Sequence, residues 1–401
     1  MDNNLGGMNM EIIDDLIQGT DFIKAEDSPS MNSVLRGKVP HPLWVINCIC
    51  GGGIPLSIQT EFSGSPSSGK TTSSYIMLGT FLRDNEDGVG IVIDTEGSLD
   101  LERLKALGVD TSRIIRLPAT SIENGFANMF RMFNKLEIKQ KEGKNVSIMI
   151  VFDSVSSGGT NKQNQSAKAG ESVLNSGSMM ELPRILKQNT ANVFPYMENI
   201  PALVIYINQV FTTGIGSYHP TVKSGGGNGF HHNMQFELVY GDPKDVYEGS
   251  FIVGSECSVM MKKSKISPKF VNIPCYIDVR NGGKIDEALS FMNYLSSGDV
   301  GIIKTGSYYN IKDTIDLMIE RYPVLKDNKD LMNYYKSIRR GDLIKYIKSD
   351  KDLKNFLQIR LIDFINEIYP LQKEINNSFR ESLIIDCSYF DKGEVDNEET
   401  E

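Results

Sequence analysis

The chain has 401 residues, of which 40% are hydrophobic and 23% are charged, so it is long enough for one substantial core with smaller appendages. No stretch approaches the roughly 18 consecutive apolar residues of a membrane helix, and the N-terminus carries acids where a secretory signal carries lysines. The five cysteines are few for this length, which argues against a disulfide framework. We therefore expect a cytoplasmic protein with no membrane partner and with buried free thiols.

The formal net charge of −9 is concentrated at the two ends of the chain. Residues 1–30 contribute −6 and residues 391–401 contribute −5, which leaves +2 for the part between them. Acidic ends are usually solvated and disordered, but they can also compete with nucleic-acid phosphates for a basic groove. Residues 386–401 are therefore interpreted as an acidic tail, and its regulatory role stays open.

Near the N-terminus, apolar residues of the segment 11–18 share one helical face, and Gly19 follows where a helix would end. A polar stretch at 26–30 separates this segment from the rest of the chain. We expect residues 1–32 to form a helical segment for oligomerisation. Docking of the same helix on its own core is an alternative that the sequence leaves open.

From residue 57 onward, short apolar runs alternate with helical patterns, as expected for buried parallel strands between covering helices. The runs are residues 58–63, 90–94, 147–153 and 202–209. After Gly254 the pattern changes to hairpin-like strands at 257–262 and 271–279, which end at the turn 281–283. The predicted fold class is α/β, with a mainly parallel sheet flanked by helices over residues 33–284.

Residues 285–385 are rich in Leu, Ile and Tyr at helical spacing and predict a smaller, mainly helical domain. Its lysines and arginines between residues 326 and 354 lie among aromatic residues and could touch a DNA backbone. They also alternate with aspartates, so the residues favour a solvated helical surface.

The strongest motif is a match to G-x-x-x-x-G-K-[ST] between a predicted strand and a helical pattern at 73–83. Its residues are Gly64, Ser65, Pro66, Ser67, Ser68, Gly69, Lys70 and Thr71. Glycines let backbone N–H groups surround nucleotide phosphates, whose charge also favours a helix N-terminus. We expect Lys70 to reach the β- and γ-phosphates and Thr71 to hold Mg²⁺.

Two other predicted strands end in carboxylates, which such a nucleotide site requires. Asp153 ends one strand and is expected to meet the Mg²⁺, although an aspartate that caps the next turn is the alternative. Glu96 follows the strand at 90–94, at the sheet edge where ligands bind. It is the general-base candidate, which would accept a proton from the attacking water or orient it.

The fourth predicted strand ends at Gln209 and leads into residues 210–228, which contain many Gly, Ser and Thr. This composition predicts a long flexible loop that starts beside the nucleotide. The amide of Gln209 could sense the γ-phosphate and order the loop. The glycine-rich end of the loop could bring backbone N–H groups to nucleic-acid phosphates.

These motifs resemble, in order and spacing, those of the RecA recombinases, including their phage UvsX branch, over about residues 33–310. The segment 64–72, which extends the phosphate loop to Thr72, is similar to the family's phosphate loop, and 94–100 resembles the segment with its catalytic glutamate. The resemblance implies that Glu96 is catalytic, that Asp100 contacts adenine, and that ATP and Mg²⁺ are the cofactors. Arg103 stands where bacterial members often have a stacking tyrosine, so the adenine stacking partner stays open. The divergence of the chain from bacterial members suggests a phage source.

The strand end at 207–209 is similar to the family's nucleotide-sensing segment, which implies a role for Gln209 in hydrolysis. The loop after it resembles the second DNA-binding loop, in which Tyr218 matches an aromatic residue that inserts between bases. The other DNA-binding candidates here are Lys223, Gly226, Gly227 and Asn228.

The first DNA-binding loop of the family would fall within residues 156–178, where this chain is longer and richer in Gly, Asn and Ser than bacterial members. Arg184 and Lys187 follow on a predicted helix and are candidates for phosphate contacts.

Residues 253–256 and 263–266 resemble the segment whose two lysines reach the ATP of a neighbouring subunit in the family. Lys263 and Lys265 are two residues apart on a predicted strand, so they would share one face toward a γ-phosphate across an interface. Two solvated edge lysines are the alternative, which the residues alone favour.

The resemblance implies an ATP-dependent DNA recombinase, a DNA-dependent ATPase that forms a helical filament on single-stranded DNA and pairs it with homologous double-stranded DNA. Single-strand-binding and loading proteins are its expected partners, in the host cytoplasm if the source is a phage. Two alternatives stay open: an accessory scaffold that binds ATP and DNA without strand exchange, and a RecA-fold helicase motor.

Overall fold

A computed structural model describes residues 18, 37–168, 181–213, 221–270, 272–297, 302–306, 308–323, 326 and 337–383. The predicted acidic tail and, apart from residue 18, the predicted N-terminal segment lie outside these residues. Within the described ranges, none of the helices has the length and apolar character needed to cross a bilayer.

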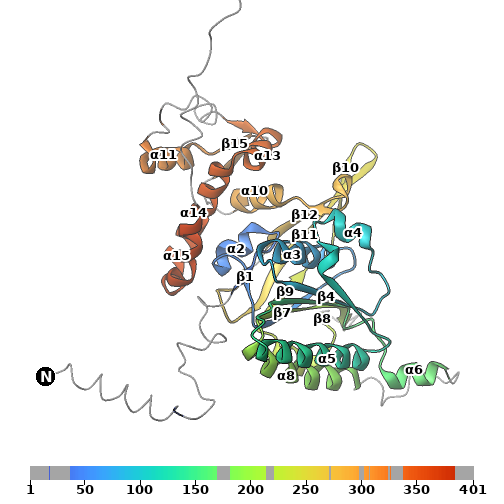
Figure 1. Cartoon of the computed structure of the whole chain (residues 1–401). Helices are drawn as coiled ribbons and strands as arrows, with labels where there is room; N and C mark the ends of the chain where they lie inside the picture. Colours follow the sequence, from blue (N-terminus) through green and yellow to red (C-terminus); the bar gives the residue numbers. More distant parts are fainter. Residues whose placement is uncertain are drawn as a thin grey trace, which may run out of the picture.

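A large central sheet organises the chain, with the strand order β13-β12-β11-β9-β3-β7-β6-β4-β5 (Figure 1). The strands from β9 to β5 run parallel. Their bounds are β3 Ile58–Gly64, β4 Val89–Asp94, β5 Ile114–Pro118, β6 Ile148–Asp153, β7 Ala202–Thr213 and β9 Phe236–Tyr240. The four parallel strands predicted from apolar runs are confirmed. The sequence analysis missed β5, which is a half-exposed edge strand, and β9, which is short and contains a glutamate.

Antiparallel strands extend the sheet beyond β9. They are β10 Lys244–Glu248, β11 Phe251–Ser264, β12 Ile273–Asp278 and β13 Lys284–Ile285. The two predicted hairpin strands correspond to β11 and β12 and are confirmed, but β11 begins earlier because its first half pairs with β10 as a projecting ribbon. A separate pair is formed by β1 Lys38–Val39 and β2 Ile54–Pro55.

Helices cover both faces of the sheet, which completes the predicted α/β fold (Figure 1). One face carries α2 Trp44–Cys50, α3 Lys70–Asp84 and α10 Glu287–Ser297, and the other carries α5 Ile122–Lys141 and α8 Glu181–Asn199. In α5, Ile122, Phe126, Met129 and Phe133 recur at helical spacing and are buried, so this face packs on the sheet. The hydroxyl of Ser121 caps the helix by accepting a hydrogen bond from the N–H of Asn124.

Shorter elements connect these layers. They are α4 Leu101–Ala106, α6 Asn161–Lys168, β8 Thr221–Ser224, α9 Gly227–Asn233 and the 3₁₀ turns Thr111–Arg113 and Val279–Asn281. Both α4 and α9 follow strand ends of the central sheet, so they lie close to the edge where the carboxyl ends of the parallel strands meet.

The C-terminal part is mainly helical, as predicted, and it also contains a small antiparallel sheet that the sequence analysis missed. Its helices are α11 Lys312–Arg321, α13 Arg340–Ser349, α14 Lys351–Ile368 and α15 Lys373–Ser382, with the 3₁₀ turn Pro370–Gln372. Its strands are β14 Ile303–Thr305, β15 Tyr308–Asn310 and β16 Ile338–Arg339. Helices α14 and α15 pack on α2, where the side-chain amide of Gln372 donates to the carbonyl of Ile49 at 3.0 Å. The C-terminal helices therefore share one hydrophobic core with α2, α3, α10 and the face of the sheet that these helices cover.

Candidate nucleotide and DNA site

The phosphate loop lies between the end of β3 and the start of α3. Gly64 passes so close to a neighbouring strand that a Cβ there would lie 2.2 Å from the carbonyl oxygen of Tyr240. Gly69 precedes α3 with φ 96°, a left-handed conformation that glycine adopts without steric cost. The two glycines thus turn the chain tightly enough to present backbone N–H groups at the start of a helix, which is the arrangement that binds phosphates.

Lys70 is buried at the first position of α3. Its ammonium group donates to the carbonyl oxygens of Gly64 at 2.9 Å and Ser65 at 2.6 Å. Burial lowers the pKa of this amine to about 8, against the opposing effect of Asp153. A bound triphosphate would supply the negative charge that the buried amine lacks, so Lys70 is suited to bind phosphate.

Thr71 and Asp153 meet directly although 82 residues separate them. The Thr71 hydroxyl donates to Oδ2 of Asp153 at 2.9 Å. Burial raises the pKa of this carboxyl to about 6, because a charge there is poorly solvated. A hydroxyl and a carboxylate are the hard oxygen donors that Mg²⁺ prefers, and the ion would restore the charge on Asp153, so this pair fits the expected Mg²⁺.

These two pKa values predict that MgATP binds most tightly between about pH 6 and about pH 8. Below this window Asp153 takes up a proton and loses the charge that the metal needs, and above it Lys70 loses the charge that the phosphates need. Affinity should fall by at most about tenfold per pH unit on either side. A titration with a fluorescent ATP analogue, from below pH 6 to above pH 8, measures this profile.

The control for the pH profile is Asp153→Asn, because ATP itself takes up a proton near the lower limit. The variant should bind MgATP more weakly but lose the acidic limb that Asp153 causes. An unchanged acidic limb in Asp153→Asn would assign that limb to the nucleotide and contradict the role given to Asp153.

Glu96 lies after β4, exposed to solvent at the carboxyl edge of the sheet. Its Oε1 accepts hydrogen bonds from the hydroxyls of Ser154 at 2.7 Å and Ser157 at 2.6 Å. The side-chain amide of Gln209 in turn donates to the Ser157 hydroxyl at 3.2 Å. The hydroxyl of Ser157 therefore connects the general-base candidate to the predicted nucleotide sensor. The sequence analysis missed both serines, whose signal was a serine-rich run directly after β6.

Asp100 and Arg103 lie at the start of α4. Oδ1 of Asp100 accepts from the backbone N–H groups of Glu102 and Arg103, so this residue serves as the helix N-cap. The guanidinium of Arg103 donates to the hydroxyl of Thr72 at 3.0 Å. The structure therefore brings Arg103 to the first turn of α3, beside the phosphate loop.

The loop predicted at 210–228 is partly regular structure, which corrects that prediction. Strand β7 continues to Thr213, and β8 pairs with it antiparallel, with Phe211 opposite Lys223. Tyr218 lies outside the described residues. The Gly, Ser and Thr content suggested a flexible loop. Antiparallel pairing of β8 with the end of β7 instead extends the sheet as a hairpin.

Gly226 caps α9 and Gly227 begins it, so the glycine-rich segment starts a helix. These two residues and Asn228 line a surface groove of about 660 Å³. The start of α8, Phe211 of the hairpin and Lys262 also line the groove. Arg184 and Lys187 are exposed on α8, the helix that packs against α9. The described DNA-binding candidates thus gather around α8, α9 and the hairpin.

Lys263 and Lys265 are arranged differently from the prediction of two side chains on one strand face. The ladder between β11 and β9 is irregular between Met261 and Lys263, and β11 ends before Lys265. The Lys263 amine donates to the carbonyl oxygens of His231 and His232 at the end of α9, whereas Lys265 is exposed. Strand β11 ends at Ser264, between the two lysines, so the strand periodicity on which the prediction rested does not extend to Lys265.

Register places Lys263 away from the phosphate loop of its own chain. It pairs with Glu237, which pairs with Glu61, and Gly64 lies three residues further along β3. At about 3.3 Å per residue, Lys263 is displaced from the phosphate loop by roughly 10 Å in the direction of the strands.

A phosphate-loop motif, a carboxylate on a parallel strand that is hydrogen-bonded to the threonine of this motif, and a glutamate at the next strand end together define an α/β protein of the RecA-like P-loop class. The sequence model of the RecA N-terminal domain family matches residues 42–283 of this chain. The chain therefore belongs to the RecA family. The resemblance inferred from the motifs is thereby confirmed, whereas the phage source stays a prediction.

Individual relatives are distant. The protein RecA of Ureaplasma parvum serovar 3 is 26% identical over 266 residues, which cover 65% of this chain and 72% of that protein. The recombination and repair protein of Enterobacteria phage T4 is 26% identical over 261 residues, 63% of this chain and 61% of that protein. Protein RecA of Mycoplasma pneumoniae is 33% identical over 109 residues, 27% of this chain and 31% of that protein.

Proposed function

We propose that this protein is an ATP-dependent DNA recombinase, which polymerises on single-stranded DNA and pairs it with a homologous duplex. The observation that carries the proposal is the hydrogen-bonded connection from Glu96 through Ser157 to Gln209, at the base of the β7–β8 hairpin. A change at the γ-phosphate that moves Glu96 or Gln209 would alter this connection and hence the hairpin. Nucleotide state and DNA affinity would then be coupled.

In this proposal each residue of the nucleotide site has one task. Lys70 and the backbone N–H groups of the phosphate loop bind the β- and γ-phosphates, and Thr71 and Asp153 hold the Mg²⁺ that neutralises them. Glu96 orients the attacking water and accepts its proton, while Ser154 and Ser157 hold the carboxylate in place. Asp100 and Arg103 bind the nucleoside side of ATP.

Lys263 and Lys265 act on the ATP of a neighbouring subunit in this proposal. The distance of Lys263 along the sheet from its own phosphate loop supports this, because a group that acts across an interface must lie away from its own nucleotide. ATP would then be enclosed only in the assembled filament. The N-terminal segment 1–32 would bind the adjacent subunit and so contribute to oligomerisation.

DNA is proposed to follow the groove between the hairpin, α8 and α9. Backbone N–H groups at Gly226, Gly227 and Asn228 and the charges of Arg184 and Lys187 would contact phosphates. Tyr218 would insert between bases, with Lys223 on the same hairpin. Single-strand-binding and loading proteins are the proposed partners, and the proposed location is the cytoplasm. The acidic tail would compete with DNA for this groove.

ATP hydrolysis with and without single-stranded DNA, over a series of salt concentrations, tests the proposal. We expect DNA to stimulate hydrolysis, and added salt to reduce the stimulation, because phosphate contacts release counterions. Steady hydrolysis that DNA leaves unchanged would contradict a recombinase and favour an accessory scaffold. Electron microscopy of the DNA complex adds a second criterion, since helical filaments support the proposal and closed hexameric rings support a helicase motor.

A further inference from the structure

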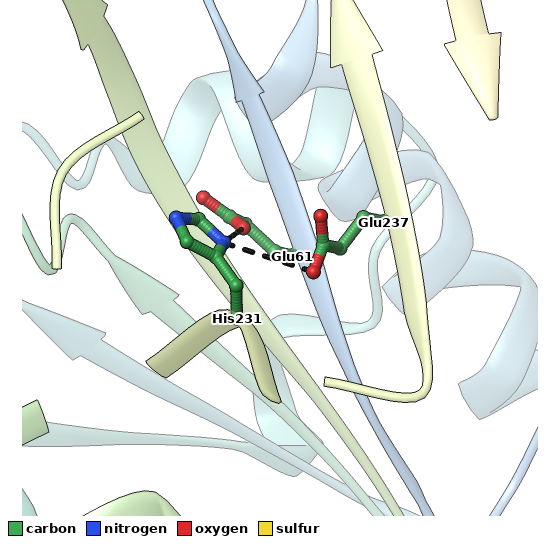
Figure 2. A group of neighbouring side chains, drawn as sticks. All are labelled: Glu61, His231 and Glu237. Atoms are coloured by element: carbon green, nitrogen blue, oxygen red, sulfur yellow. Dashed lines mark ion pairs between the residues drawn. The ribbon is translucent and has the colours of Figure 1, made fainter. Parts of the chain in front are cut away.

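Three ionisable side chains meet inside the molecule, away from the phosphate loop (Figure 2). Glu61 on β3 and Glu237 on β9 are direct partners in the parallel ladder, so both side chains leave the sheet on the same face. His231 of α9 points between them. Its Nδ1 lies 2.8 Å from Oε2 of Glu61 and 3.7 Å from Oε1 of Glu237.

Burial makes this group costly unless something compensates its charge. Glu61 is 1% exposed and Glu237 is 3% exposed. Within the described residues, His231 is the one cationic partner that forms an ion pair with either carboxylate. A protonated His231 therefore leaves one negative charge without a contact partner, which the amine of Lys263, directed at the carbonyl oxygens of α9, offsets only from a distance.

The three converging atoms contact one another without well-formed hydrogen bonds. Nδ1 of His231 and Oε2 of Glu61 are paired by charge at 2.8 Å, but neither of them, nor Oε1 of Glu237, has a hydrogen-bond partner of good geometry. The atoms on the far side are held in place: Asn208 donates to Oε1 of Glu61 at 2.8 Å, and Nε2 of His231 lies 3.2 Å from the Ser224 hydroxyl. Once the imidazole releases its proton, three lone pairs converge on one point and neighbours orient the outer atoms, which is the arrangement of a metal-ligand set.

The separations suit a small divalent ion. Ligand atoms about 2.0–2.2 Å from a metal lie roughly 3 Å apart in octahedral and roughly 3.4 Å apart in tetrahedral geometry. The separations of 2.8 and 3.7 Å lie on either side of these values, and all three atoms fall within 4.8 Å of one another. One imidazole with two carboxylates suits first-row ions such as Zn²⁺ and Mn²⁺, and two carboxylates balance the charge of such an ion.

We propose that Glu61, His231 and Glu237 bind one divalent transition-metal ion, separate from the Mg²⁺ of the nucleotide site. The ion would fasten the end of α9 to β3 and β9. Because Asn208 contacts both Glu61 and the carbonyl oxygen of Gly225, the bound ion would also fix the glycine-rich segment that begins α9. This site goes beyond the proposed recombinase function and is tested without ATP or DNA.

Equilibrium dialysis of the full chain against Zn²⁺, with Mg²⁺ in excess to occupy the nucleotide site, measures the stoichiometry. We expect one Zn²⁺ per chain for the unaltered protein. Glu237→Gln keeps the size of the side chain but removes a charged ligand, and it should weaken binding by at least about 100-fold. His232→Ala is the matched control, because His232 is exposed on the same helix and outside the cluster, and it should bind Zn²⁺ like the unaltered protein.

Substitution with Co²⁺ gives a second readout that does not depend on a stable Glu237→Gln variant. A buried nitrogen and oxygen ligand set should produce visible absorption bands in the unaltered protein and in His232→Ala. No retained Zn²⁺ and no Co²⁺ bands in the unaltered protein would overturn the proposal. Binding that survives Glu237→Gln but disappears in His232→Ala would equally overturn it, by assigning the ion to the surface histidine.

Discussion

Replacing Glu96 with glutamine is expected to lower the rate of ATP hydrolysis by about 10²–10⁴-fold while ATP binding is retained. Glutamine has the same shape, and its carbonyl oxygen can still accept the hydrogen bonds from Ser154 and Ser157. It cannot accept a proton from water at neutral pH. The substitution therefore removes the general base and leaves the phosphate loop and the metal ligands unchanged.

Single-turnover hydrolysis and the affinity for a fluorescent ATP analogue, measured on the same preparation, separate these two effects. Glu102→Gln provides a matched control, because Glu102 is exposed in the adjacent helix α4 and its carboxylate forms an ion pair only with Lys105 in the described chain. Its hydrolysis rate should equal that of the unaltered protein. A Glu96→Gln variant that hydrolyses ATP within a few-fold of the normal rate would show that another group activates the water.

Replacing Lys70 with alanine should abolish most ATP binding, and hydrolysis with it. This variant removes the buried ammonium group, so the β- and γ-phosphates lose a charge-assisted hydrogen-bond donor. We expect a cost of about 3 kcal/mol, which corresponds to roughly 100-fold in affinity. Lys70→Arg should also bind poorly, because a planar guanidinium does not fit a space shaped for a compact ammonium group.

Isothermal titration with MgATP measures this loss, and circular dichroism shows whether each variant is folded. Lys105→Ala is the control, since this exposed lysine in α4 pairs with Glu102 and does not contact the phosphate loop. If folded Lys70→Ala bound MgATP with nearly normal affinity, the motif at 64–71 would not be the nucleotide site.

Local sequence was sufficient to predict the phosphate loop and the strands around it. The spacing of glycines and Lys70 is a contiguous signal, and its chemistry requires no knowledge of the rest of the fold. The approach of Asp153 to Thr71 was also predictable, because parallel strands place their carboxyl ends at one edge of the sheet. The mainly parallel sheet and the helical C-terminal part followed from apolar periodicity, and the P-loop class followed from the motif at 64–71.

Tertiary structure alone decided which side chains meet across strands. Glu61, His231 and Glu237 come from β3, α9 and β9, and nothing in their local sequence relates them, because the register of β3 with β9 is set by packing and not by either segment alone. The hydroxyl connection from Glu96 to Gln209 likewise depends on the order β7-β6-β4 in the sheet. The sequence thus determined the phosphate-loop motif and the carboxylates expected beside it, whereas long-range strand pairing determined how these residues connect to the hairpin and which side chains form the buried cluster.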